Sequence, residues 1–152
     1  MQITRTDSNN PDFRTLVKAL DADLRSRNGD AMQNTYDAFN VIDYLDTVVI
    51  VYDNGIPVGC GCFKPFDEDS VEIKRMFVKD EYRGRGIGRL LIEELEAWAK
   101  ESGYNSTVLE TGKKHVEAIG LYQRQGYLLI PNYGQYVGLS ESVCMKKSLS
   151  PS

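Results

Sequence analysis

The sequence predicts a single α/β domain built on a mixed sheet, with antiparallel strands first and a parallel strand–helix–strand–helix–strand segment after them. Two apolar runs flank the hairpin signal Asp53-Asn54-Gly55, which favours antiparallel pairing in the first half. From Val71 onward, strand-like and helix-like runs alternate, and this order implies parallel pairing. The 152 residues can bury one core, so we expect one domain over 1–147 and a loose tail over 148–152.

The first elements are a strand over residues 1–5 and a helix that begins after Asn10. Asn10 is a plausible N-cap, proline follows in the first turn, and apolar residues recur at helical spacing over 13–24. Residues 28–43 show no clean period, so a short helix and a loop fit them equally well. Two antiparallel strands follow, over 47–52 and 56–63.

The remaining elements follow from the same signals of periodicity and helix termination. A third antiparallel strand is expected over 71–78, because β-branched and aromatic residues alternate there. Leucines at helical spacing and a glycine stop then define a helix. The expected order is a helix over 89–100, a strand over 107–111, a helix over 116–125, a strand over 126–130 and an exposed final strand over 142–147.

Composition limits the classes of function. The chain is 41% hydrophobic and 26% charged, with a net charge of −4, as in ordinary globular proteins. Because a nucleic-acid binder normally carries a basic face, we expect no nucleic-acid partner. The mild acidic excess favours cationic substrates such as amines. No signal-peptide or membrane-spanning run is present, so we expect a cytoplasmic protein without a membrane partner.

Three cysteines, Cys60, Cys62 and Cys144, are too few and wrongly spaced for a disulfide framework or a metal site. We therefore expect no metal, and we interpret these cysteines as small packed residues. A more informative pattern is Arg83-Gly-Arg-Gly-Ile-Gly88, which lies between an expected strand and an expected helix. Its glycines allow the backbone to approach a ligand where free N–H groups begin a helix, so it predicts a phosphate site. It matches neither the dinucleotide fingerprint nor the P-loop.

A second motif makes the phosphate site more specific. Residues 83–88 match Arg-x-x-Gly-x-Gly, and Ala118, Leu121, Tyr122, Gly126 and Tyr127 match A-x-x-L-Y-x-x-x-G-F/Y. With both motifs in this order, the chain resembles the GCN5-related N-acetyltransferase (GNAT) superfamily, in its branch of small bacterial proteins. The resemblance covers roughly residues 47–147. It implies a GNAT-like acyl-CoA N-acyltransferase fold, acetyl-CoA as acetyl donor and a primary amine as acceptor.

The resemblance also implies which residues hold the donor. Backbone N–H groups of the glycine loop would bind the pyrophosphate while Arg83 or Arg85 adds charge. A bulge in the central strand would supply an oxyanion donor, and the strand edge would pair with the pantetheine arm. His115 stands where the family often has a cofactor-contacting asparagine. The implied cofactor-binding residues are Met76, Phe77, Val78, Arg83, Gly84, Arg85, Gly86, Ile87, Gly88, Arg89 and His115.

By the same resemblance, Tyr122 would lie beside the coenzyme A sulfur and donate a hydrogen bond or proton to the thiolate. The alternative is an ordinary core tyrosine. Glu72 is the first candidate for the base that deprotonates the amine, Glu110 the second, and ordered water a third. Strand alternation places Glu72, Lys74 and Met76 on one face and Ile73 and Phe77 on the other.

The residues of the acceptor pocket are the hardest to identify from the sequence. Tyr36 is a candidate substrate contact from the segment expected to overlie the pocket, along with Phe39, and Glu110 and Tyr133 are two more. The loop over 131–136 resembles an acceptor-side loop of one bacterial branch, and the acceptor can be a small molecule or a peptide. A homodimer that pairs through residues 142–147 is possible.

Two other classes of function compete with an acetyltransferase. A nicotinamide-dependent oxidoreductase is disfavoured, because the third glycine of its fingerprint and a second nucleotide-binding half are missing. A non-catalytic acyl-CoA sensor or interaction module is the stronger alternative, because a fold does not guarantee turnover. Tyr122 together with an intact glycine loop favours an enzyme.

Overall fold

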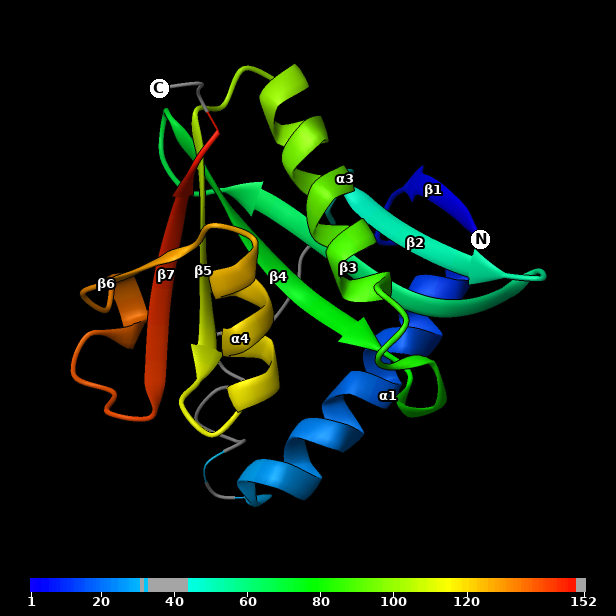
Figure 1. Ribbon diagram of the computed structural model, residues 1–152, viewed down its shortest axis with the longest axis horizontal. Coiled ribbons are helices and arrows are strands. Elements are labelled where there is room, and N and C mark those ends of the chain that lie inside the picture. Colours follow the sequence, from blue (N-terminus) through cyan, green and yellow to red (C-terminus); the bar gives the residue numbers. More distant parts are fainter. Residues whose placement is uncertain (31, 33–43, 150–152) are drawn as a thin grey trace.

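The computed structural model describes residues 1–30, 32 and 44–149, and the candidate contacts Tyr36 and Phe39 lie outside them. Within these residues the strands form one mixed seven-stranded sheet in the order β1-β2-β3-β4-β5-β7-β6 (Figure 1). The predicted α/β class is therefore confirmed. The strands are β1 (Gln2–Thr6), β2 (Val48–Asp53), β3 (Ile56–Pro65), β4 (Ser70–Val78), β5 (Ser106–Gly112), β6 (Leu128–Ile130) and β7 (Ser142–Ser148).

Helices cover both faces of this sheet. Helices α3 (Ile87–Glu101) and α4 (Val116–Arg124) lie on one face, and α1 (Pro11–Asn28) lies on the other (Figure 1). The core therefore has two parts, one under α3 and one under α1. Residues 48–51 of β2 are all apolar because alternate residues enter different parts of the core: Val49 and Val51 pack under α3, whereas Val48 and Ile50 pack under α1. Among the described residues, no helix is long and apolar enough to cross a bilayer.

Local signals explain where the first elements begin and turn. The Asn10 side-chain oxygen accepts hydrogen bonds from the N–H groups of Asp12 (2.8 Å) and Phe13 (3.3 Å), so it caps α1 as predicted. Asn54 and Gly55 both have positive φ, 50° and 79°, and join β2 to β3 as a two-residue hairpin. The helix cap and the hairpin turn could be predicted from the sequence because each depends on a few neighbouring residues.

The C-terminal half differs from the expected pairing. β4 and β5 are parallel neighbours, but β6 does not pair with β5. Instead β7 lies between them and is antiparallel to both. The prediction that residues 142–147 form an exposed edge is wrong, because β7 pairs with β5 along its whole length and the short β6 takes the edge.

Ser148 and Leu149 were expected in a loose C-terminal tail, but the structure places them in the sheet and its core. Ser148 pairs with Ser106 as the last residue of β7, and the Leu149 N–H donates to the Asn105 carbonyl at 2.7 Å. Leu149 also packs against the core under α3. These two residues belong to the sheet and its core rather than to a loose tail.

Candidate active site

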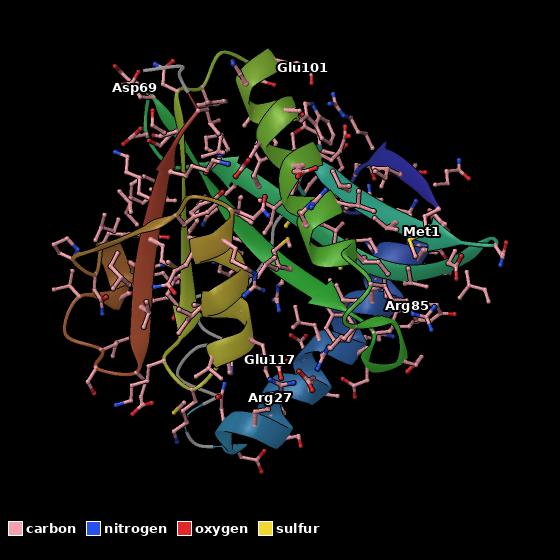
Figure 2. The ribbon with its side chains drawn as sticks, viewed as in Figure 1. Met1, Arg27, Asp69, Arg85, Glu101 and Glu117 are labelled. Atoms are coloured by element: carbon pink, nitrogen blue, oxygen red, sulfur yellow. The ribbon has the colours of Figure 1, made fainter. Side chains whose placement is uncertain are left out.

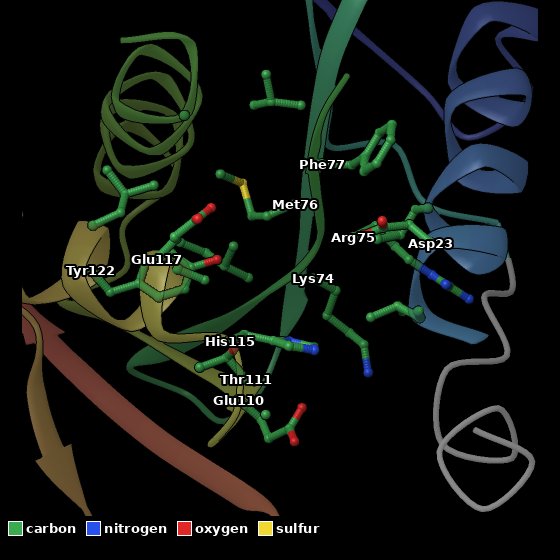
Figure 3. Close-up of a pocket in the computed structure, with 18 of the residues that line it drawn as sticks. Asp23, Lys74, Arg75, Met76, Phe77, Glu110, Thr111, His115, Glu117 and Tyr122 are labelled. Atoms are coloured by element: carbon green, nitrogen blue, oxygen red, sulfur yellow. The ribbon is translucent and has the colours of Figure 1, made fainter. Parts of the chain in front are cut away.

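The site forms where two neighbouring parallel strands separate. β4 pairs with β5 only from Ser70 to Ile73, although β4 continues to Val78 and β5 to Gly112. A cavity of about 760 Å³ opens beyond this point. Its walls come from α1, the end of β4, the glycine loop, the end of β5 and α4 (Figure 3). Its volume is within the range of small-molecule sites.

A bulge in β4 decides which side chains enter each side of the cavity. Cys60 pairs with Phe77 and Cys62 with Lys74, so Gly61 alone faces both Arg75 and Met76. Arg75 has a positive φ of 58°. A Cβ on Gly61 would lie 2.5 Å from the Met76 sulfur, so any other residue there would force the Met76 side chain to move.

The bulge corrects the expected alternation. Ile73 and Met76 both pack with the core under α3, whereas Phe77 packs with the core under α1. Figure 3 shows Met76 and Phe77 on opposite sides of β4. The sequence placed Ile73 and Phe77 on one face because strict alternation assumes one residue per step, and the bulge inserts an extra residue.

The glycines of the glycine loop, residues 84–88, have two different structural roles. Gly84 and Gly86 each have φ of 79°, and a Cβ at either would meet open space. Gly86 also caps α3 without a side-chain hydrogen bond, which leaves the first helical N–H groups available to an anion. Gly88 instead permits close helix packing, because a Cβ there would lie 2.8 Å from Leu121 of α4.

The three arginines around this loop are placed differently. Arg83 holds the loop in position: its Nε donates to the Val78 carbonyl at 3.0 Å, and its guanidinium pairs with Asp80 at 2.6 Å. Arg89 lines the cavity as an exposed side chain. Arg85 lies over the Tyr82 ring, does not line the cavity, and is seen apart from the lining residues Arg27 and Glu117 in Figure 2.

Tyr122 of α4 lies in the cavity wall. Its side chain is buried, and its ring contacts Tyr127 edge-on at 5.7 Å between centroids. Within the described part of the chain its hydroxyl makes no hydrogen bond. Burial raises the pKa of Tyr122, and the charge of Glu110 raises it further. The phenol therefore stays protonated at neutral pH and can donate a hydrogen bond.

The structure distinguishes the two candidate bases. Glu72 is buried and engaged: it accepts a hydrogen bond from the Tyr133 hydroxyl at 2.7 Å and pairs with Lys64 at 3.7 Å and Lys74 at 4.0 Å. Burial raises the pKa of Glu110 from 4.5 to about 7, although a Ser142 hydrogen bond and then the charge of Lys74 oppose the rise. A base that titrates near neutral pH suits proton transfer better, so we rank Glu110 first.

Two tyrosines of the loop before β7 are placed differently from what the sequence predicted. Tyr133 does not line the cavity; it holds Glu72 and stacks edge-on against Phe66 and Tyr136. Tyr136 is buried in the cavity wall, with Lys74 Nζ 3.5 Å from its hydroxyl. Sequence reasoning missed Tyr136 and Lys74 as site residues, although residues 131–136 were singled out as a segment.

His115 lies at the entrance to α4, where the cavity meets the end of β5. Its ring packs against Gly112, where a Cβ would lie 3.3 Å away. Burial lowers the pKa of His115, and the charge of Arg27 lowers it further. Its Nε2 atom is buried and, among the residues described, has no hydrogen-bond partner. The Nε2 atom of a neutral His115 ring can therefore form a hydrogen bond with a ligand.

Comparisons with known proteins agree with this geometry. The family model described as Acetyltransferase (GNAT) family matches residues 13–127. An IAA acetyltransferase from Azospirillum brasilense is 38% identical over 97 residues, which cover 63% of each protein. The matches cover 29% of a Dictyostelium discoideum N-acetyltransferase and 39% of one from Xenopus tropicalis, so the chain spans less than two thirds of these relatives.

Solved structures share the fold over all or part of the chain. A Klebsiella pneumoniae protein assigned as an acyl-CoA N-acyltransferase is 29% identical, with a TM-score of 0.81 over 98% of this chain and 97% of that one. A GNAT family acetyltransferase from Elizabethkingia anophelis, solved with acetyl-CoA bound, is 21% identical with a TM-score of 0.59 over 67% of this chain and 75% of that one.

Proposed function

Because the chain belongs to the acetyltransferase (GNAT) family, we propose that it transfers the acetyl group of acetyl-CoA to a primary amine by direct attack on the thioester. The observation that carries this proposal is the shared cavity of Glu110 and Tyr122. One has a pKa of about 7 and can accept a proton at neutral pH, whereas the other stays protonated and can donate a hydrogen bond. Amine acyl transfer needs both.

The chain offers a binding surface that suits acetyl-CoA. Gly84 and Gly86 present open backbone at the start of α3, which fits a pyrophosphate. Beyond Ile73, β4 has no strand partner on the β5 side, so its backbone at Met76–Val78 is available to the pantetheine amides, except for the Val78 carbonyl, which accepts from Arg83. His115 Nε2 provides one further polar contact along the same cavity. Acetyl-CoA would supply the activated thioester.

Each step of the proposed chemistry has a residue in the cavity. Glu110 accepts a proton from the incoming ammonium and leaves a neutral amine as nucleophile. The irregular backbone at the Arg75–Met76 bulge provides N–H groups outside the regular ladder, where an oxyanion donor is needed. Tyr122 donates a hydrogen bond to the departing sulfur. Glu72 is held in place by Lys64 and Tyr133.

A panel of primary amines, assayed by thiol release from acetyl-CoA, tests the proposal. We expect turnover with at least one amine in the wild-type protein and a loss of about 100-fold in Glu110→Gln, the scale of general-base catalysis. Acetyl-CoA affinity, measured by calorimetry, should be similar in both proteins. Binding without thiol release across the panel would favour an acyl-CoA sensor, and stabilisation by NADH in place of acetyl-CoA would contradict the acetyltransferase.

A further inference from the structure

Glu141 lies in the turn before β7 and lines the cavity. Its main chain is fixed, because the Lys113 N–H donates to the Glu141 carbonyl at 2.8 Å, and its Oε1 lies 3.2 Å from Lys113 Nζ. Its other oxygen, Oε2, is buried and accepts no hydrogen bond from any described residue. A buried polar atom without a protein partner is costly, so Oε2 in this cavity wall can accept a hydrogen bond from a bound molecule.

Glu141 is close to the candidate base. It precedes Ser142, which pairs with Gly112 at the end of β5 and also hydrogen-bonds the carboxylate of Glu110. Glu110 and Glu141 both line the cavity, and Ser142 is next to Glu141 in the chain and hydrogen-bonds Glu110. A molecule whose amine is held at Glu110 would have its next few atoms near Glu141.

Among the described residues, the cations that line the cavity leave Glu141 Oε2 without a partner. The lining residues Arg27 and Arg75 already have acidic partners, at 3.2 Å from Asp23 and 2.6 Å from Asp21. Lys74 pairs with Glu72, and Lys113 occupies only one oxygen of Glu141. An ionised carboxylate oxygen can only accept, and a charged donor makes the stronger bond.

We infer that Glu141 binds a second ammonium group of the acceptor, so that diamines and longer polyamines are preferred over monoamines. The inference rests on the proposed function, because it takes Glu110 as the site of the reactive amine. Glu141 acts here as a specificity-determining residue: it selects which amine binds and takes no part in proton transfer.

The test is a calorimetric titration of the CoA-bound protein with α,ω-diamines of two to five carbons and with the matched n-alkylamines. We expect the wild-type protein to bind at least one diamine roughly 10-fold more tightly than its monoamine, the scale of one charge-assisted hydrogen bond. Glu141→Gln should reduce this preference to about twofold or less. Glu68→Gln, which removes an exposed carboxylate outside the cavity, should leave the preference unchanged.

A second variant separates recognition from a structural role of the ion pair. Lys113→Met removes the competing cation, so it should maintain or increase the preference for diamines. Equal losses in Lys113→Met and Glu141→Gln would overturn the inference, because they would show that only the ion pair matters. A wild-type protein that binds no diamine, or binds both amines equally, would also overturn it. Diamine preference without acetyl transfer would support the inference and refute the proposed function.

Discussion

Replacing Glu110 by Gln should change how the stability of the protein depends on pH. Burial raises the pKa of Glu110 from 4.5 to about 7 in the folded protein. Below pH 4.5 the carboxyl group is protonated in both the folded and the unfolded chain, so it imposes no cost. Between these two pKa values the unfolded chain ionises first, so stability falls as pH rises. Above pH 7 both states are ionised and the cost is constant.

The size of this effect follows from the same two values. At about 1.4 kcal/mol per pH unit, the interval from 4.5 to about 7 corresponds to about 3 kcal/mol of stability lost between pH 4 and pH 8. The glutamine side chain in Glu110→Gln cannot ionise, so the variant does not lose this stability. Relative to the wild-type protein, the variant should therefore gain about 3 kcal/mol over this interval.

Denaturant unfolding at pH 4, 6 and 8 measures the difference between the two proteins. The pH profile of kcat/KM gives a second readout: the wild-type rate should fall below about pH 7 as Glu110 is protonated, and the variant should lack this limb. A stability difference that is the same at all three pH values would refute the raised pKa. An unchanged acidic limb in the variant would remove Glu110 as the base.

Three further substitutions test other parts of the site. Tyr122→Phe should lower turnover by roughly 10-fold to 100-fold with acetyl-CoA affinity within about twofold, because only the leaving thiolate loses its donor, and equal turnover would remove Tyr122 from the mechanism. Gly86→Val should abolish acetyl-CoA binding in calorimetry. Gly103→Val, which also changes a glycine of positive φ but lies remote from the cavity, should retain binding. If both variants bind acetyl-CoA equally well, the loop is not the phosphate site. Tyr133→Phe should cost about 1–3 kcal/mol in denaturant unfolding because buried Glu72 loses its 2.7 Å donor, and an unchanged midpoint would contradict that role.

Much of the architecture could be predicted because its signals are local. The Asn10 cap, the Asn54-Gly55 turn and the periodicity of residues 89–100 each depend on a few neighbouring residues, and the structure places each as expected. The glycine loop was also found in this way, since its backbone conformation is set by Gly84 and Gly86. The placement of Tyr122 followed from a motif match.

The sequence by itself determined most of the elements, the glycine loop and the candidate residues for the proposed chemistry. Tertiary structure decided which of them meet. The bulge at Arg75 depends on Gly61 in another strand, and the insertion of β7 beside β5 depends on pairing between distant segments. The pKa of Glu110 depends on burial by several elements, so the choice between Glu110 and Glu72 could be made only in the folded protein.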